Sequence, residues 1–311
     1  MDIMIYLMVF GPMAAAVISF LIGKNSKPAR DLFVWAAVAA EFLLSLSLVF
    51  FFGGEAGERL VTLPGVCGLG LSFTAGGFRS IYAAIASFMW LITGLLSPEY
   101  FAHYRSRNRY YLFQLLTLGA TVAVFLSADL YTTFVFFEIM SLCSYVWVAQ
   151  DEKEASLRAG GTYLAVAVIG GMVLLMGLFL LHREAGTLVI SELSAACEGK
   201  NLWPAALCML VGFAGKAGAF PIHIWLPKAH PVAPAPASAL LSGILTKSGV
   251  FGLIVICANM MPGNEAFGNA LLILACITMF LGALLALFSV DLKRTLACSS
   301  MSQIGFITVG L

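Results

Sequence analysis

The sequence predicts an all-α polytopic membrane protein with about ten transmembrane helices. Of its 311 residues, 61% are hydrophobic and 11% are charged, whereas a soluble domain carries about 25% charged residues. Apolar runs long enough to cross a bilayer recur along the whole chain. An open strand cannot satisfy its backbone hydrogen bonds in lipid, so these runs are expected to be helices.

The apolar runs define the spans in order, and no separate soluble domain is visible between them. The first run lacks the basic region and cleavage site of a signal peptide, so we expect it to remain as a span. The last run stops within apolar sequence, which indicates a chain cut short in a tenth helix. The expected spans are 3–22, 32–53, 80–98, 110–127, 129–149, 160–181, 203–220, 237–259, 268–289 and 295–311.

Two longer loops, 54–79 and 182–202, are predicted to cap the helices without carrying chemistry. The first favours a small hairpin and the second a short amphipathic helix. Cys67 and Cys197 fall in these loops on the same side, and two free thiols are expected there rather than a disulfide. The seven cysteines show no CxxC and no Cys/His ligand spacing, so the sequence predicts neither a metal site nor a cofactor.

Basic residues in the loops predict the orientation. Loops after odd-numbered spans hold eleven lysines and arginines, and loops after even-numbered spans hold four. The positive-inside rule then places the N-terminus outside the inner (plasma) membrane of the cell. The eleven are Lys24, Lys27, Arg30, Arg105, Arg107, Arg109, Lys153, Arg158, Lys228, Lys293 and Arg294, and the four are Arg59, Arg79, Arg183 and Lys200.

Four charges remain at membrane depth after the loops are counted. Lys216 and Lys247 are the two of seventeen basic residues that fall in spans, and only Glu41 and Glu138 of sixteen acids lie well inside one. A lysine in hydrocarbon costs about 2.5–3.5 kcal/mol on insertion scales, so it usually has a task and a partner. Two bases and two acids are what paired burial requires.

The two acids differ in the strength of their signal. Glu138 has about nine helical residues on each side, which places it near the bilayer midplane. The alternative to a transport role is a neutral carboxyl satisfied by a neighbouring hydroxyl. Glu41 lies in AVAAEFLLSL. A structural role, in which it faces a partner subunit or is protonated, and a functional role are equally supported.

The two lysines lie in glycine-rich helices. Gly215, Gly218 and Pro221 surround Lys216, and the proline should break or kink the helix because it removes a backbone hydrogen bond. A broken helix at membrane depth is typical of a segment that lines a cavity. Small residues also serve close helix packing, but the lysine argues against packing alone.

Lys247 sits among glycines and hydroxyls in SGILTKSGVFG, and its alternative is a lysine that snorkels to the interface. Burial lowers the pKa of a lysine, and a nearby carboxylate raises it again. A Glu–Lys pair is therefore a natural proton switch.

His223 and His230 flank the turn between these two helices. Histidine titrates near neutral pH, so both are candidates for proton access to the buried lysines. A hydrogen-bonded turn residue is an equally good interpretation.

The stretch GKAGAFPIHIWLPKAHPVAPAPASALLSGILTKSGVFG resembles the signature of the antiporter-like membrane subunits of respiratory complex I. The same family includes membrane-arm subunits of energy-converting hydrogenases and large subunits of Mrp-type Na⁺/H⁺ antiporters. FFEIMSLCSY and DLKRTLACSSMSQIGFITVGL resemble the fifth-helix motif and the start of the tenth helix. The resemblance covers nearly all of the chain.

The resemblance implies a fourteen-helix core with two inverted five-helix repeats. It divides this chain into 1–109 with helices 1–3, 110–259 with the complete first repeat and its broken seventh helix, and 260–311 with the start of an incomplete second repeat. In that family a fifth-helix Glu and a seventh-helix Lys form a coupled pair, and an eighth-helix base passes the proton on. These roles carry over to Glu138, Lys216 and Lys247.

Two departures from the family pattern stand out. The sequence ends within the expected helix 10, so it does not include the eleventh-helix histidine and the twelfth-helix Lys or Glu that complete the exit route in that family. Either the sequence is a fragment, or a second polypeptide completes the second half-channel. Gln303 stands where some members have a histidine, and relay at that point would need water.

The sequence therefore predicts a proton-translocating membrane subunit of a complex I-type NADH:quinone oxidoreductase or a related membrane-bound hydrogenase. The chain has no redox motif of its own, so electron transfer is expected in partner subunits. The expected partners are other membrane-arm subunits of a multisubunit complex, H⁺ or Na⁺, and the lipid bilayer, and no nucleic acid is expected. The alternative is a subunit of an Mrp-type Na⁺/H⁺ antiporter without redox coupling. A third interpretation is a structural anchor whose buried charges fix helix packing.

Overall fold

The computed structural model describes residues 2–52, 59–66, 68–104 and 106–311, and most of them are helical. The chain forms two compact units, and one short segment from its second half belongs to the N-terminal unit. The N-terminal unit comprises Met1–Gln150 and Pro234–Leu240, and the C-terminal unit comprises Asp151–Ala233 and Leu241–Leu311. The division into 1–109, 110–259 and 260–311 stays a prediction.

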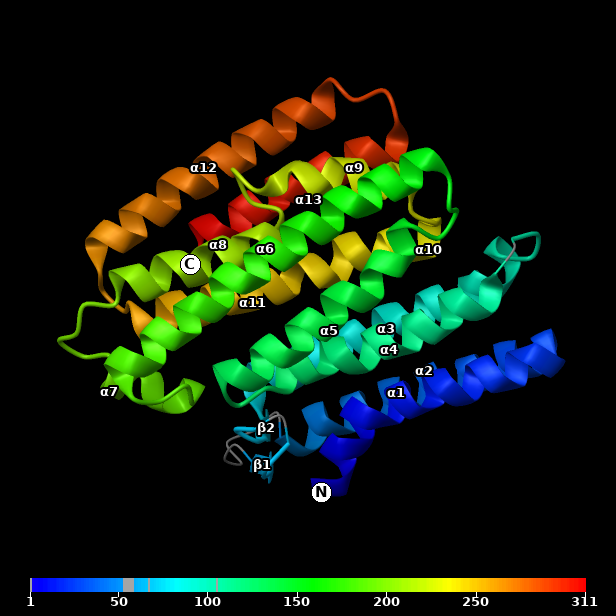
Figure 1. Cartoon of the computed structure of the whole chain (residues 1–311), viewed down its shortest axis with the longest axis horizontal. Helices are drawn as coiled ribbons and strands as arrows, with labels where there is room; N and C mark the ends of the chain where they lie inside the picture. The colour runs from blue at the N-terminus through cyan, green and yellow to red at the C-terminus, as the bar shows by residue number, and fades with distance from the viewer. Residues whose placement is uncertain (1, 53–58, 67, 105) are drawn as a thin grey trace. The chain divides into compact units, whose positions relative to one another are not determined.

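Four long helices form the body of the N-terminal unit. Helix α1 packs on α2 and α4, and α3 packs on α2 and α4, so the four close into a bundle (Figure 1). Helix α5 packs on α4, and the short α10 packs on α3. Their bounds are α1 Asp2–Asn25, α2 Lys27–Phe52, α3 Gly77–Tyr100, α4 Arg107–Leu126, α5 Leu130–Val148 and α10 Ala235–Leu240.

A two-stranded antiparallel hairpin, β1 Arg59–Leu63 and β2 Leu71–Ala75, confirms the hairpin expected in the first long loop. It is tied to the turn between α4 and α5. Ala128 N donates to Ser72 O at 2.8 Å, and Ser72 N donates to Thr132 Oγ1 at 2.9 Å. The pairing state of Cys67 is untested, because that residue lies outside the described residues.

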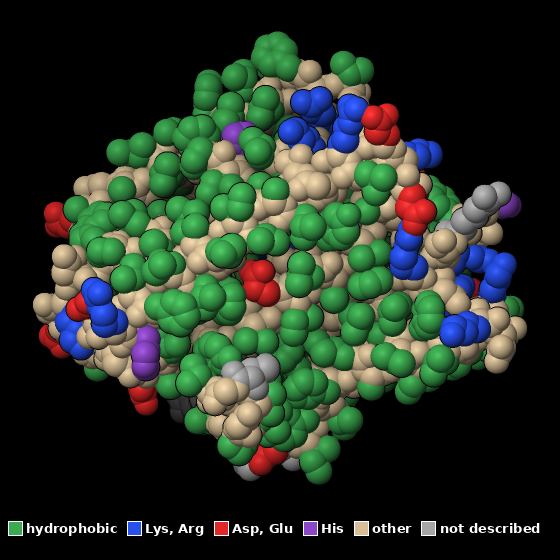
Figure 2. All heavy atoms as spheres, in the orientation of Figure 1, with side chains coloured by type: hydrophobic (Ala, Val, Ile, Leu, Met, Phe, Trp, Pro, Cys, Tyr) green, Lys and Arg blue, Asp and Glu red, His purple; other side chains and the backbone are tan. Residues whose placement is uncertain are grey.

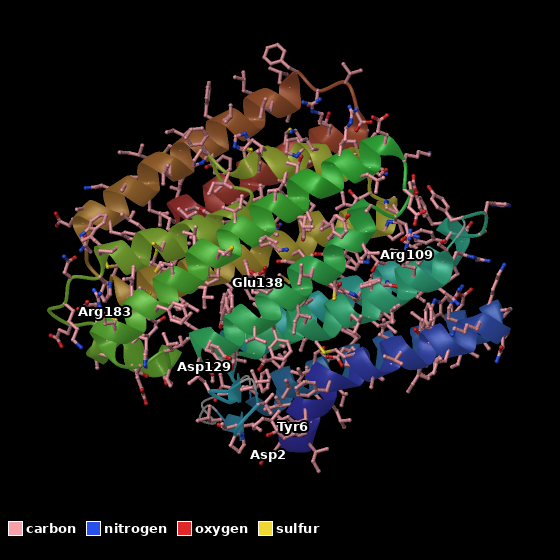
Figure 3. The ribbon with its side chains drawn as sticks, viewed as in Figure 1. Asp2, Tyr6, Arg109, Asp129, Glu138 and Arg183 are labelled. Atoms are coloured by element: carbon pink, nitrogen blue, oxygen red, sulfur yellow. The ribbon has the colours of Figure 1, made fainter. Side chains whose placement is uncertain are left out.

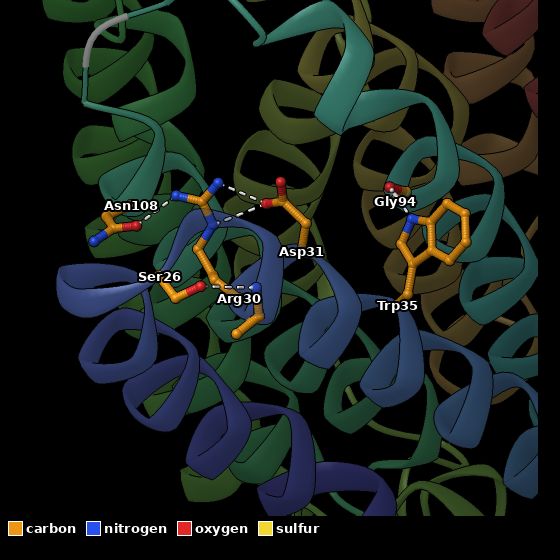
Figure 4. A network of polar contacts seen from close by, with 7 residues as sticks. Ser26, Arg30, Asp31, Trp35, Gly94 and Asn108 are labelled. Atoms are coloured by element: carbon orange, nitrogen blue, oxygen red, sulfur yellow. Dashed lines mark hydrogen bonds and ion pairs between the residues drawn. The ribbon is translucent and has the colours of Figure 1, made fainter.

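A buried arginine fastens the α1–α2 turn to the start of α4 (Figure 4). Arg30 is 1% exposed and donates through Nε and Nη2 to Asp31 Oδ1, at 2.9 and 2.6 Å. Its Nη1 donates to Asn108 Oδ1 at 2.5 Å, and the guanidinium lies 4.5 Å from the centroid of the Tyr111 ring. The planar fork of arginine suits this set of partners better than the ammonium of lysine does.

Arg30→Ala is expected to destabilise the N-terminal unit by about 3 kcal/mol, because the partners of a buried charge are left without it. Thermal unfolding of the purified chain in detergent measures this change. Arg183→Ala is the control, because Arg183 pairs with Glu184 at the surface and exposed pairs contribute about 0.2–1 kcal/mol. Equal melting shifts for the two variants would contradict the assignment.

The C-terminal unit is built on two helix pairs and a broken helix. Helix α6 packs on α8, α8 on α11, α12 on α13, and α13 on α9. Gly212 of α8 lies so close to α6 that a Cβ there would stand 2.8 Å from Gly170 O, as expected of small residues at a membrane helix interface.

The bounds in this unit are α6 Glu154–Ala185, η1 Ile190–Glu192, α7 Leu193–Ala196, α8 Trp203–Ala217, η2 His223–Trp225, α9 Leu226–Val232, η3 Leu241–Leu245, α11 Thr246–Val255, η4 Ile256–Met260, α12 Glu265–Leu287 and α13 Leu292–Val309. Segments η3 and η4 are π-helical. The short η1 and α7 confirm the small helix expected in the second long loop.

A helix stands at each of the ten expected spans, which confirms the all-α polytopic class. Eight are long and apolar enough to cross a membrane among the described residues. Trp203–Ala217 is shorter, since it ends at the break beside Lys216. In Figure 2, hydrophobic side chains cover most of the face that the view presents. The eight are Asp2–Asn25, Lys27–Phe51, Gly77–Tyr100, Arg107–Leu126, Leu130–Val148, Glu154–Ala185, Ala235–Met260 and Glu265–Leu287.

Candidate functional site

Glu138 lies in the middle of α5 in the N-terminal unit (Figure 3). The helix begins where Asp129 caps it, with Asp129 Oδ1 accepting from Thr132 N at 2.7 Å, a standard N-cap arrangement. The Glu138 side chain is half-buried, and its Oε1 atom is fully enclosed. Glu138 and Lys216 belong to different units, so their pairing stays a prediction.

Lys216 occupies the last turn of α8 and is 5% exposed. Its Nζ donates a hydrogen bond of 2.7 Å to the hydroxyl of Tyr163 on α6, and it lies 5.0 Å from the centroid of that ring. Tyr163 is itself 2% exposed. The lysine is therefore held inside the C-terminal unit by a hydrogen bond to the phenol oxygen at the edge of the Tyr163 ring.

Trp225 fixes both members of this pair from beyond the helix break. Its Nε1 donates to Gly215 O at 2.7 Å, and its ring meets the Tyr163 ring edge-on at 5.0 Å between centroids. Trp225 is 1% exposed. The indole therefore ties the second half of the broken helix to the turn that carries Lys216.

The break itself follows from the glycine at 218. Helix α8 ends at Ala217, three residues before the expected end, and Gly218 takes the left-handed conformation with φ 79° and ψ 31°. Ala219 N donates to Ala214 O at 2.9 Å, which closes a Schellman-type cap. Phe220 N then donates to Thr278 Oγ1 of α12 at 3.0 Å, so Pro221 follows a chain that has already left the helix.

Lys247 lies at the start of α11, directly after the π-helical η3. Its Nζ donates to Ser242 O at 2.8 Å, and the Ser242 hydroxyl hydrogen-bonds Ser300 on α13. Single π-helical turns inside α-helices are frequent at functional sites. This turn places a backbone carbonyl within reach of the lysine.

His230 is buried in α9, outside the candidate membrane spans, and is 2% exposed. Burial lowers its pKa to about 4, with smaller contributions from Lys293 and Lys247. Lys293 Nζ donates to Ala233 O at 2.8 Å, which holds it at the end of the same short helix. The pKa of His223 is also lowered by burial. Both histidines are therefore neutral near pH 7.

Lowering the pH from 7 to 5 is expected to destabilise the C-terminal unit by about 2 kcal/mol through His230. Its pKa is about 4 in the folded chain against an ordinary value of 6.5, so the unfolded chain binds the extra proton. The stability is present above pH 6.5 and is lost as the pH falls toward 4. Denaturant unfolding of wild type and His230→Gln at the two pH values measures it. The same pH dependence in both would contradict the assignment.

Tyr163 and Trp225 are site residues that the sequence analysis missed. Aromatic residues are ordinary in apolar spans, and nothing in the spacing links Tyr163 to a lysine 53 positions later. For Trp225, the sequence offers one signal, which is its position two residues after His223. Gln303 lies exposed on α13, where the structure gives it no partner in the described site.

Comparison with known proteins supplies the family. A family model described as "NADH:quinone oxidoreductase/Mrp antiporter, TM" matches residues 127–311. Hydrogenase-4 component B of Escherichia coli (strain K12) is 29% identical over 247 residues, 78% of this chain and 37% of that protein. A Na(+)/H(+) antiporter subunit from Alkalihalophilus pseudofirmus is 30% identical over 247 residues, 78% of this chain and 50% of that protein. The chain thus spans half or less of these curated relatives.

Two solved structures share the fold. One is the archaeal membrane-bound sulfane sulfur reductase, with a TM-score of 0.90 and 20% identity over 99% of this chain and 64% of the other. The second is the Mrp complex from Dietzia sp. DQ12-45-1b, with a TM-score of 0.87 and 23% identity over 99% of this chain and 58% of the other. With the family model matching more than half of the sequence, the chain belongs to the NADH:quinone oxidoreductase/Mrp antiporter transmembrane family.

Proposed function

We propose that this chain is a proton-translocating membrane subunit of a complex I-type NADH:quinone oxidoreductase or a related membrane-bound hydrogenase. The observation that carries the proposal is Lys216, a nearly fully buried lysine at a helix break, hydrogen-bonded to the Tyr163 hydroxyl. An intramembrane ionisable residue is a functional site by default. A broken helix beside it supplies polar backbone groups at that depth.

The proposed route uses three charged side chains in turn. Glu138 and Lys216 exchange protonation states as a coupled pair, and Lys247 passes the proton onward. Tyr163 holds the Lys216 ammonium in one position, and the Ser242 carbonyl does the same for Lys247. Each proton that leaves Lys216 or Lys247 must be replaced from the preceding residue of the route. The charge of the Glu138–Lys216 pair therefore sets the direction of transfer.

The energy for transport is proposed to come from partner subunits. Relatives and structural neighbours with this fold are named as parts of hydrogenase, antiporter and respiratory membrane complexes. Electron transfer in a partner would then act on the Glu138–Lys216 pair by moving a charge or a helix near it. An N-terminus outside the plasma membrane fits the loop charges.

Glu138→Gln is expected to reduce proton transport roughly tenfold or more in vesicles that contain the assembled complex. Glutamine keeps the size of the side chain but cannot bind and release a proton. Transport is measured with a pH-sensitive dye after addition of the electron donor. Glu154→Gln is the matched control, because Glu154 is 79% exposed at the start of α6.

The same vesicles separate the alternative, a subunit of an Mrp-type antiporter without redox coupling. That function predicts a pH change driven by a Na⁺ gradient with no electron donor present, and no co-purifying electron-transfer subunits. Comparable identity to a hydrogenase component and an antiporter subunit keeps both functions in the test. Full transport by the assembled Glu138→Gln complex would refute the role of the pair and favour a structural anchor.

A further inference from the structure

Glu41 is the second acid at membrane depth, and the proposed route does not use it. It lies on α2 in the N-terminal unit and is 2% exposed within its own chain. Buried positions recur along α2 at three- and four-residue spacing and include Arg30, Val34, Val38, Glu41, Ser45 and Leu48. This stripe faces the interior of a helix bundle, so Glu41 points into the bundle and away from lipid and from other chains.

Two contacts of α2, one with α1 and one with α3, fix the level of Glu41 in the bundle. Ser47 Oγ lies 3.5 Å from Met4 Sδ on α1, and the Phe42 and Phe88 rings lie 5.6 Å apart between α2 and α3. Continuing these antiparallel registers places Glu41 opposite Phe10 on α1 and beside Met89 on α3. Glu41 is therefore close to mid-height in the four helices.

The carboxyl has no counter-charge at this level. Glu41 makes no hydrogen bond and no ion pair with the described residues, and its Oε1 atom is fully enclosed. The buried positions of α1 and α3 carry no titratable side chain. On α4 the titratable groups are Arg107, Arg109, Tyr110 and Tyr111, all in its first turns near the other end of the bundle. Arg30 shares the stripe, but Asp31 and Asn108 already occupy its donors.

Unsatisfied polar groups line the bundle between Glu41 and Asp31. Pro12 lies inside α1 and has no N–H, so the carbonyl of Met8 loses its helical donor at the level of Glu41. On α4, both amide atoms of Gln114 and the hydroxyl of Tyr111 are enclosed without a partner among the described residues. Buried polar groups of this kind are usually satisfied by internal water.

From this geometry we propose that Glu41 is a proton-binding site in the α1–α4 bundle, separate from the Glu138–Lys216–Lys247 route. The ligand is a proton held as a neutral carboxylic acid, since an ionised carboxylate without a counter-charge is disfavoured in an apolar core. Internal water at Gln114 and Tyr111 connects the site with the partly exposed Asp31. The Met8 carbonyl is the acceptor that the helix leaves available for the acid O–H.

Infrared spectroscopy of the full chain in lipid vesicles at pH 7 tests the proposal without any transport measurement. The wild-type spectrum should contain a carboxylic-acid C=O band that Glu41→Gln removes and the exposed control Glu154→Gln retains. Exchange into D₂O should shift this band, and Tyr111→Phe with Gln114→Leu should slow the shift. Loss of a carboxylate band in Glu41→Gln, in place of the acid band, would overturn the proposal.

A second measurement on the wild-type chain covers the case in which Glu41→Gln does not fold. A hydrophobic carbodiimide adds to a protonated carboxyl: the acid oxygen bonds to the central carbon, and the proton moves to nitrogen. Peptide mass mapping at pH 7 should find the adduct on Glu41. Suppression of this labelling by Na⁺ would identify a Na⁺ site and overturn the assignment to a proton, as would labelling of Glu138 with none on Glu41.

Discussion

Replacing Lys216 by methionine is expected to lower transport by the reconstituted complex roughly tenfold or more, the equivalent of at least about 1.4 kcal/mol in a barrier. Methionine keeps an unbranched side chain of similar reach, so the cavity beside Tyr163 stays filled. It removes the ammonium that binds and releases a proton. Proton uptake by vesicles, measured per assembled complex, gives the result.

Tyr163→Phe separates positioning from proton binding at the same site. Phenylalanine keeps the ring that packs on Trp225 but loses the hydroxyl that accepts from Lys216 Nζ. The ammonium that binds and releases the proton stays in this variant and only its hydrogen bond is lost, so transport should fall by less than in Lys216→Met. In the Lys216→Met background, Tyr163→Phe should add little, because the two side chains act together.

Lys228→Met is the matched control, since Lys228 is exposed on α9. It should transport at the wild-type rate and have wild-type stability. Lys216→Met at the wild-type rate, with normal assembly, would show that the buried lysine is structural. Additive effects of Lys216→Met and Tyr163→Phe would show that the 2.7 Å hydrogen bond does not matter for transport.

Much of the fold follows from hydrophobicity and loop chemistry. A helix forms at each expected span, and the small hairpin and the short α7 lie in the loops where they were expected. These features depend on local physics: lipid excludes unpaired backbone groups, and glycine and proline punctuate the chain. The end of α8 was misplaced by three residues because Gly218, rather than Pro221, closes the helix.

The candidate site was only partly readable from sequence. A count of charges isolates Glu138, Lys216 and Lys247, because an ammonium or carboxylate inside a span is rare. Tyr163, which accepts a hydrogen bond from Lys216, lies on another helix, and a phenol in an apolar run gives no signal of its own. The π-helical turn before Lys247 is also invisible, since its hydrogen-bond shift depends on packing against neighbouring helices.

Burial separates residues that the sequence treated alike. His223 and His230 have equal standing as turn histidines, yet the bundle encloses His230 far more than His223. Glu41 was ranked below Glu138, although Glu41 is the more deeply buried of the two. Sequence periodicity gives the stripe but not the depth, because depth depends on how many helices surround it.

Gly249→Ala is expected to destabilise the C-terminal unit by about 3 kcal/mol or more through overpacking. Gly249 lies where α11 crosses the end of α8. A Cβ there would stand 2.5 Å from Ala217 N and 3.0 Å from Ala217 Cα. These are backbone atoms in the turn that carries Lys216, so no side chain can swing away to relieve the contact.

The strain should therefore appear in function as well as stability. Separating α11 from α8 displaces the turn that carries Lys216 relative to α6, which disturbs its hydrogen bond to Tyr163, so transport should fall even where the protein assembles. Gly268→Ala is the control, because nothing lies within 4 Å of its Cβ on α12 and alanine favours a helix by roughly 0.5–1 kcal/mol. Thermal unfolding in detergent should show a lower midpoint for Gly249→Ala and an equal or higher one for Gly268→Ala. Equal midpoints and equal transport for the two variants would show that α8 and α11 do not need this close crossing.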